Sequence, residues 1–170
     1  MKACCFTGYR PDKMPFPLSR DNEDYVAFSE RLFAAIENAA RDGYDTFYSG
    51  GALGFDIIAA ELVLSLREKY GLTFIIAAPY KNQAANFSPS WRSRYDWVLM
   101  QANSVVYVSE NYSRECFQKR NEYMVDRSER VIAFFDGKRG GTANTLRYAH
   151  RKERQVVNLA IDETQLYLDI

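Results

Sequence analysis

The regular alternation of apolar runs with helical patterns is the feature that most narrows the folds open to this chain. Six runs rich in β-branched and aromatic residues have the length of strands: residues 3–7, 46–49, 73–78, 104–109, 131–136 and 156–161. Apolar side chains between them recur at spacings of three and four, which indicates amphipathic helices. Unbroken apolar strands that alternate with helices are typical of parallel sheets covered on both faces. The sequence therefore predicts a doubly wound α/β fold with a mainly parallel sheet and helices on both faces.

The helical patterns cover most of the chain between the predicted strands. The first lies within residues 25–39, and the others lie at 58–66, 91–102, 117–128 and 142–152. Residues 80–90 show no clear period and are expected to form a loop. No linker or repeat divides the chain, and 170 residues fit one domain of roughly 150 residues. We therefore expect a single domain over residues 1–170.

Charge and composition exclude several classes of protein. Lys and Arg number 22, as do Asp and Glu, so the chain is not a globally basic nucleic-acid binder. The densest apolar stretch, 57–66, contains Glu61 and falls short of the roughly 18 residues that a membrane span needs. Cys4, Cys5 and Cys116 lack the spacing of a zinc site or a disulfide framework. We expect a soluble, cytoplasmic protein that binds neither a membrane nor a metal.

The nine glycines fall into two groups. Gly43 and Gly71 follow helical patterns, where a left-handed residue commonly ends a helix. The others follow the first, second and fifth predicted strands: Gly8, Gly50, Gly51, Gly54, Gly137, Gly140 and Gly141. In an open parallel sheet, the loops after the carboxyl ends of the strands form the ligand crevice. Glycine is thus concentrated where a ligand is expected, with Gly50 and Gly140 on the same edge of the sheet.

Three of these strand-end loops carry groups suited to anions. After the second strand, Ser49, Gly50, Gly51, Ala52 and Gly54 form a candidate phosphate cradle, which could equally be a tight turn into a helix. The carboxylate of Asp56, at the start of that helix, either opposes the helix dipole or accepts a hydrogen bond from a ribose hydroxyl.

The other two loops add a guanidinium and a second helix start. Thr7, Gly8 and Arg10 end the first strand, and Arg offers a planar fork for phosphate. Gly140, Gly141 and Thr142 open the last helix with small residues. The plainer interpretation is an exposed arginine in one loop and a solvated turn in the other.

Residues 80–94 combine aromatic rings with amide groups that could contact a base, among them Tyr80 and Gln83. The alternative is that Trp91, Tyr95 and Val98, at helical spacing, are ordinary core residues.

Four segments together resemble a known group of proteins. FTGYRP at 6–11, SGGALGFDIIAAE at 49–61, KRNEYMVD at 119–126 and DGKRGGT at 136–142 resemble the SLOG superfamily, most closely its YpsA-like bacterial branch. SGGALGFD is also similar to a segment of the DNA-processing protein DprA, another SLOG member. The resemblance implies a Rossmann-like fold and a nucleotide or nucleotide-derived ligand, with phosphate at the glycine loops. Three glycine loops, two helix N-termini, Arg10 and Arg120 exceed what one phosphate requires, which favours a diphosphate joined to ribose, such as ADP-ribose or a related NAD-derived nucleotide.

The resemblance also bears on catalysis. Phosphoribohydrolases of the LOG type carry R-K-x-x-M and G-G-x-G-T-x-x-E motifs, and this chain keeps Arg120, Met124 and the paired glycines. Counting on from Gly140 places Arg147 at the catalytic Glu, and a permanent cation cannot replace that acid. A binding or sensor protein that uses Arg120 for phosphate is therefore favoured over an enzyme.

Two other functions stay open. A nucleotide N-glycosidase would need another acid, with Glu61, Asp126 and Asp136 as candidates. Binding of single-stranded DNA, as in DprA, would need basic and stacking groups along a backbone, which the even charge balance disfavours. The sequence leaves open whether the chain pairs with a second copy of itself.

Overall fold

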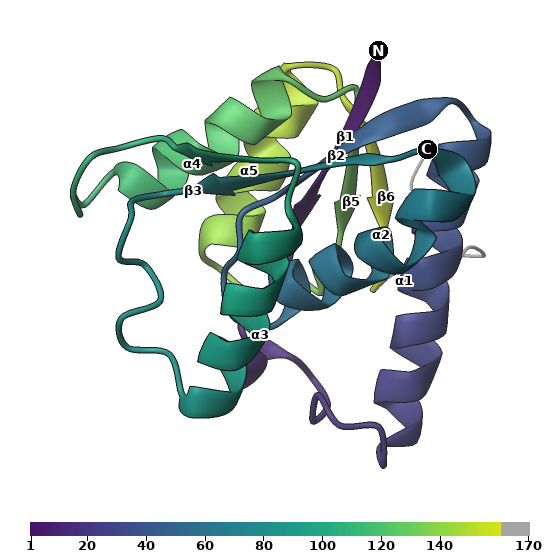
Figure 1. The fold of residues 1–170 in the computed structure, drawn as a ribbon, viewed down its shortest axis with the longest axis horizontal. Coiled ribbons are helices and arrows are strands. Elements are labelled where there is room, and N and C mark those ends of the chain that lie inside the picture. Colours follow the sequence, from purple (N-terminus) through teal and green to yellow (C-terminus); the bar gives the residue numbers. More distant parts are fainter. Residues whose placement is uncertain (161–170) are drawn as a thin grey trace.

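The six predicted strands form one parallel sheet in the computed structural model, which describes residues 1–160 (Figure 1). In chain order the strands are β1 Lys2–Thr7, β2 Tyr44–Ser49, β3 Thr73–Ala78, β4 Ser104–Tyr107, β5 Arg130–Ala133 and β6 Gln155–Asn158. The strands β4 and β5 end two and three residues before the predicted ends at 109 and 136. The predicted end of the last strand, at 161, lies outside the described residues.

The order of the strands reverses in the middle of the sheet. The spatial order is β4-β3-β2-β1-β5-β6, and every neighbouring pair is parallel. The chain moves outward from β1 to β4 and then returns to place β5 on the other side of β1. In such sheets, ligands bind at the carboxyl ends of the strands where the order reverses, which here is between β1 and β5.

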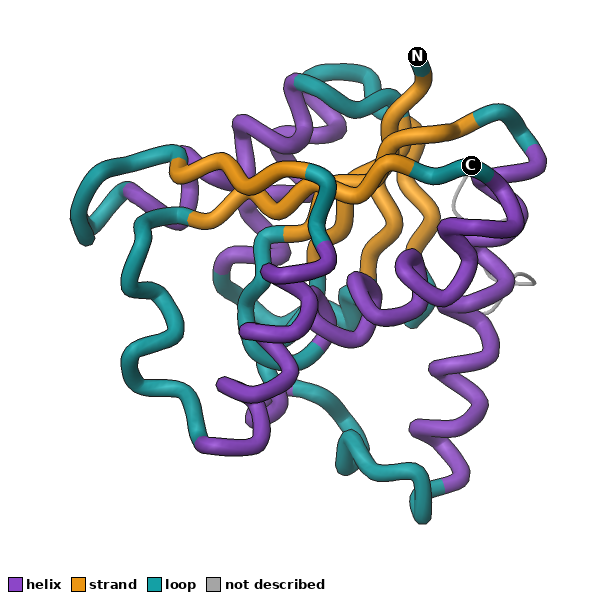
Figure 2. The backbone as a smooth tube through the Cα atoms, in the orientation of Figure 1, coloured by secondary structure: helices purple, strands orange, loops and turns teal. Residues whose placement is uncertain are grey.

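Helices cover both faces of the sheet, as predicted for a doubly wound, Rossmann-like fold. They are α1 Glu23–Arg41, α2 Phe55–Tyr70, α3 Pro89–Gln101, α4 Cys116–Asp126 and α5 Gly141–Arg151, with a short 3-10 helix, η1, at Pro11–Lys13. The pair α4 and α5 packs on one face, whereas α1 and α2 pack on the other, where α3 joins α2 (Figure 1). Figure 2 shows the long loop between β3 and α3 that was expected at 80–90. No helix among the described residues is long and apolar enough to cross a membrane.

Local sequence explains where these helices begin and end. The Asn22 side chain accepts a hydrogen bond of 3.1 Å from the backbone N–H of Tyr25 and caps α1. Gly43 and Gly71 have φ values of 91° and 65° and follow α1 and α2, as their positions predict. The helix α3 begins at Pro89, two residues before its predicted start, because proline suits the first turn of a helix.

The two larger of three apolar cores lie on opposite sides of the sheet. The larger one packs Phe6, Phe47 and Phe55 with Phe28 of α1, and all four are fully buried. The smaller one lies under α4 and α5 and includes Cys5. These cores fix α2, α4 and α5 so that their N-termini lie at the carboxyl edge of the sheet.

Candidate functional site

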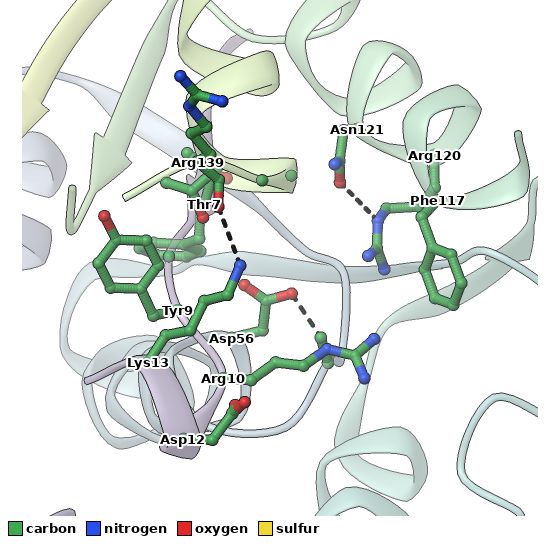
Figure 3. A pocket seen from close by; sticks show the side chains of 16 residues that line it. Thr7, Tyr9, Arg10, Asp12, Lys13, Asp56, Phe117, Arg120, Asn121 and Arg139 are labelled. Atoms are coloured by element: carbon green, nitrogen blue, oxygen red, sulfur yellow. Dashed lines mark hydrogen bonds between the residues drawn. The ribbon is translucent and has the colours of Figure 1, made fainter. Parts of the chain in front are cut away.

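A cavity of about 320 Å³ opens at the carboxyl ends of the strands β1 and β5 (Figure 3). The loop after β1, η1, the start of α2, the face of α4 and the start of α5 all contribute to its wall. The lining residues are Phe6, Thr7, Gly8, Tyr9, Arg10, Asp12, Lys13, Ala52, Asp56, Phe117, Arg120, Asn121, Arg139, Gly140, Gly141 and Thr142. The cavity thus lies where the strand order reverses.

The structure brings nine of the predicted site residues together here and leaves six outside the lining. Those in the wall are Thr7, Gly8, Arg10, Ala52, Asp56, Arg120, Gly140, Gly141 and Thr142. Those outside it are Ser49, Gly50, Gly51, Gly54, Tyr80 and Gln83. The loops that hold Gly50 and Gly140 follow parallel strands on either side of β1, so both lie on the same edge of the sheet, as expected.

The loop after β2 uses its backbone donors internally. The N–H of Gly51 donates to Ser49 Oγ at 3.2 Å, and the N–H of Ala52 donates to Asp56 Oδ2 at 3.2 Å. The N–H of Phe55, in the first turn of α2, donates to the carbonyl of Tyr9 at 3.2 Å. Two of the donors expected to hold phosphate, and the first N–H of α2, are therefore already paired.

The carbonyl of Gly50 accepts hydrogen bonds from two side chains that are distant in sequence. It accepts hydrogen bonds from Arg120 Nη1 at 2.6 Å and from Gln83 Nε2 at 3.1 Å. Gln83 also donates to the hydroxyl of Tyr95 at 3.2 Å. A Cβ atom at position 50 would lie 2.4 Å from Arg120 Nη1 and 2.8 Å from Asp56 Oδ2, so any larger residue here would have to displace these buried side chains. Gln83 and the Nη1 group of Arg120 therefore hold the loop in place.

Arg120 and Asp56 form the floor of the cavity. Only 4% of Arg120 and 6% of Asp56 are exposed, and no ion pair within 4.0 Å joins them. Burial raises the pKa of Asp56, although Arg120, the N–H of Ala52 and Arg10 oppose the shift. Burial also lowers the pKa of Arg120, and Asp56 opposes that change. Among residues 1–160, Asp56 Oδ1 and Arg120 Nη2 have no hydrogen-bond partner, so both remain available to a ligand.

The N-terminus of α5 opens into the cavity opposite this floor. Gly140 precedes the helix with a φ of 140°, and no side chain caps the first turn. Thr142, in that turn, is 6% exposed and lines the cavity. Lys13 Nζ donates to the carbonyl of Arg139 at 3.0 Å and lies 2.7 Å from where a Cβ of Gly140 would be. An ammonium group therefore lies over the positive end of a helix, where an anion is favoured.

Hydrogen bonds of Tyr9 fix the loop before α5. Its hydroxyl donates to Asp136 Oδ1 at 2.8 Å and accepts from the N–H groups of Asp136 and Lys138 at 3.1 Å each. The Lys138 ammonium contacts the carbonyl of Lys13 and pairs with Asp136 Oδ2 at 3.3 Å. The wall of the cavity between β1 and α5 is thus held by contacts between residues about 130 positions apart.

Aromatic side chains form the opposite rim. The Arg10 guanidinium lies 5.5 Å from the centre of the Phe117 ring. Behind that ring, outside the cavity lining, Tyr80 packs on Phe117 and on the exposed Tyr112. Tyr95 is buried in a small core with Ile57, so the core interpretation holds for this residue.

The acidic residues suggested for an N-glycosidase lie outside the lining. Glu61 pairs with Arg94, Asp126 accepts from the hydroxyl of Tyr148, and Asp136 belongs to the Tyr9 network. The carboxylates that line the cavity are Asp12 and Asp56. Arg147, at the position of the LOG-type glutamate, is exposed and does not line the cavity.

Sequence reasoning missed several of the lining residues: Phe6, Tyr9, Asp12, Lys13, Phe117, Asn121 and Arg139. Tyr9, Asn121 and Arg139 lie within the recognised segments, next to residues that were chosen. Lys13 could have been found from Pro11, because a proline favours the start of a helical turn, and the turn η1 that begins at Pro11 ends at Lys13. Among residues 1–160, no group of three or more His, Cys, Asp or Glu side chains is arranged to hold a metal ion.

Comparison with known proteins identifies the family. The YpsA model, described as the YspA SLOG family, matches residues 4–166. The chain belongs to this family. It is 33% identical over 144 residues to the Bacillus subtilis protein named "Uncharacterized SPbeta prophage-derived protein YoqJ", covering 76% of this chain and 84% of that one. It is 24% identical to a UPF0398 protein of Bacillus cereus, covering 93% of this chain and 87% of that one.

Solved structures of SLOG-type proteins share the fold. DprA of Helicobacter pylori aligns with a TM-score of 0.63 at 19% identity over 92% of this chain. DprA of Streptococcus pneumoniae gives 0.61 at 18% identity, also over 92% of this chain. This chain spans 64% and 50% of those two chains. The Chlamydomonas rheinhardtii Moco carrier protein aligns with a TM-score of 0.53 at 16% identity, over 99% of this chain and 84% of its own.

Proposed function

We propose that this protein binds a nucleotide or nucleotide-derived ligand in the cavity between β1 and β5, as a binding or sensor protein. The observation that carries the proposal is that one cavity contains both a position suited to a phosphate and a position suited to a sugar hydroxyl. The uncapped start of α5 with Lys13 suits a phosphate. The unpartnered oxygen of Asp56, on the buried floor, suits a sugar hydroxyl.

The balance of charge around the cavity supports an anionic ligand. Arg10, Lys13, Arg120 and Arg139 line it, against two carboxylates, in a chain whose formal net charge is zero. A local excess of positive charge in a concave site attracts anions and raises their rate of association. Membership of the SLOG family, which is expected to bind nucleotide-type ligands, supports the same class.

Binding without turnover fits the acidic groups of the site better than N-glycosidase activity does. The LOG-type glutamate is replaced by Arg147, and the three alternative acids lie outside the lining. DNA binding is the rival that the neighbours suggest, since the H. pylori DprA structure is described by its single-stranded DNA binding mode. That rival is an outcome of the test below.

The test is thermal unfolding with AMP, ADP-ribose, NAD and a short single-stranded oligonucleotide. A ligand at 100 times its dissociation constant should stabilise the fold by about 2.7 kcal/mol and raise the melting temperature by several degrees. Arg147→Ala should retain the shift, because this residue lies outside the cavity lining.

Each alternative function predicts a different result with the same set of ligands. An oligonucleotide shift larger than any nucleotide shift, and steeply reduced by salt, would favour DNA binding. Release of free base from AMP, followed by chromatography, would favour the N-glycosidase. No shift with any nucleotide would contradict the proposed function.

A further inference from the structure

The backbone donors of the cavity decide how many phosphates it can hold. A pyrophosphate carries two groups that each need several donors. At the glycine loop after β2, the N–H groups of Gly51, Ala52 and Phe55 are already paired within the protein. Three glycines of that loop, Gly50, Gly51 and Gly54, lie outside the cavity lining. These three N–H groups are therefore not available to a second phosphate in the present conformation.

The loop is also held against rearrangement. Arg120 and Gln83 both bond to the carbonyl of Gly50. A Cβ at Gly54 would lie 2.8 Å from the carbonyl of Tyr9, so the loop is also in close contact with the backbone after β1. Freeing the paired N–H groups would break buried hydrogen bonds, each of which is costly to leave unmade.

The first turn of α5 combines free donors with a buried hydroxyl and a nearby cation. Its N-terminus has no side-chain cap, and Gly141 and Thr142 line the cavity. Among the described residues, the Thr142 hydroxyl has no hydrogen-bond partner, although the residue is 6% exposed. Lys13 Nζ lies at the same spot and can exchange the Arg139 carbonyl for an anion. A hydroxyl, an ammonium and a helix N-terminus thus converge on one position.

The remaining cations do not make a second buried subsite. Arg10 is exposed and lies against Phe117, and the exposed Arg139 side chain extends away from Asp56 and Arg10 in Figure 3. At the floor, Arg120 Nη2 is free, but the Asp56 carboxyl beside it would repel a phosphate and favour a hydroxyl. The volume of about 320 Å³ is near the lower limit, about 300 Å³, for ligand pockets.

We infer that the cavity takes a ligand with a single phosphate monoester on a ribose, held by Lys13, Thr142 and the start of α5, with the ribose hydroxyls at Asp56. Ribose 5-phosphate and nucleoside monophosphates belong to this class, whereas ADP-ribose and NAD do not. This inference rests on the proposed function and narrows its ligand.

The experiment is isothermal titration calorimetry of the full chain with AMP, ribose 5-phosphate, ADP-ribose and adenosine. AMP should bind at least about tenfold more tightly than adenosine, which lacks the phosphate, since one charge-assisted hydrogen bond is worth about a factor of ten or more. AMP should also bind at least about tenfold more tightly than ADP-ribose, because the second phosphate of ADP-ribose finds no such bond. Lys13→Gln should weaken AMP binding by at least about tenfold for the same reason. Lys69→Gln removes the same charge at the far end of α2 and should change the affinity by about twofold at most.

A pair of variants at Gly141 separates charge from size. The Cβ of a residue placed here meets only Asn121 Nδ2, at 4.0 Å, so the backbone tolerates substitution. Gly141→Asp puts a carboxylate into the phosphate position. The helix dipole stabilises a negative charge there, so the fold should be retained. Gly141→Asn has nearly the same size without the charge, so Asp should weaken AMP binding at least about tenfold more than Asn.

The outcomes distinguish this inference from the proposed function. ADP-ribose binding as tightly as AMP, or adenosine binding as tightly as AMP, would overturn the single-phosphate site and leave nucleotide binding intact. Equal effects of Asp and Asn at position 141 would also overturn it. Failure of all four ligands to bind would remove both proposals together.

Discussion

Arg120 shows how one buried side chain can serve the fold and the site at once. Its Nη1 atom bonds to the carbonyl of Gly50 at 2.6 Å, and its Nε bonds to Asn121 Oδ1 at 2.8 Å. Removing it would leave Gln83 as the remaining donor to the buried Gly50 carbonyl, and it would take away the cation that most opposes the rise in the pKa of Asp56. The residue recognised from its motif as a phosphate ligand therefore has a structural role that the motif alone does not reveal.

We expect Arg120→Ala to lower the free energy of unfolding by about 1.5–3 kcal/mol, the range for hydrogen bonds to a charged group, because the variant loses the bonds to Gly50 and Asn121. Arg147→Ala, which changes an exposed arginine, should alter it by about 0.5 kcal/mol at most. Urea unfolding of both variants measures the contrast. Equal losses would mean that Arg120 does not support the loop.

Asp56 should give the protein a characteristic dependence on pH. Burial raises its pKa, so the folded protein holds this proton more tightly than the unfolded chain does. As pH rises from the ordinary Asp pKa, about 3.9, to the raised value, the free energy of unfolding should therefore fall. Asp56→Asn cannot ionise and should lack this decline, so the variant gains stability relative to the unaltered protein through that window.

Urea unfolding at a series of pH values, starting near the ordinary Asp pKa, checks this expectation. Asp21→Asn removes an exposed carboxylate and serves as the control. Parallel pH profiles for Asp56→Asn and the unaltered protein would contradict the assignment.

At the scale of elements, the joint between β1 and α2 depends on close backbone approach. Gly54 has a φ of 85°, and a Cβ there would lie 2.8 Å from the carbonyl of Tyr9. Gly71, at the end of α2, also has a positive φ, of 65°, but nothing lies within 4 Å of its Cβ position. The two glycines therefore share a backbone conformation and differ in their surroundings.

We expect Gly71→Ala to cost about 1–2 kcal/mol of unfolding free energy, the price of a left-handed conformation. Gly54→Ala should cost about 1–3 kcal/mol more, because overpacking is added. Denaturant unfolding of both variants gives the difference. Equal costs would show that the contact with Tyr9 relaxes freely.

Regular elements were predictable because their apolar spacing follows the geometry of strands and helices. The runs at 3–7 and 73–78 correspond closely to β1 and β3, and glycines mark the ends of α1 and α2. The site was less predictable, because Lys13 and Phe117 reach it from segments about 100 residues apart in sequence. Glycine spacing in SGGALG indicated a phosphate cradle, but it could not show that Ser49 and Asp56 occupy the loop's donors.

At the scale of the whole molecule, the cysteines should report on global unfolding. Cys4, Cys5 and Cys116 are all buried and free. Burial raises the pKa of Cys4 and raises that of Cys5 to about 12, which suppresses the reactive thiolate. Their positions in the central strand β1 and at the start of α4 make local exposure costly.

We therefore expect a thiol reagent such as dithionitrobenzoate to modify none of the three cysteines in the folded protein and all three in urea. The rate of modification in intermediate urea should follow the unfolded fraction measured by circular dichroism. A thiol that reacts in the absence of urea as fast as in the unfolded chain would contradict this.

The contact between Gly50 and Arg120 also constrains how this sequence can change over evolutionary time. A methyl group at position 50 would lie 2.4 Å from Arg120 Nη1 and 2.8 Å from Asp56 Oδ2, so glycine is favoured there for as long as these side chains fill that space. A lineage that first loses the arginine removes the closer of these two contacts, whereas one that first loses the glycine disrupts the loop after β2. The order of substitution is therefore restricted, and the two positions, 70 residues apart, should vary together rather than singly.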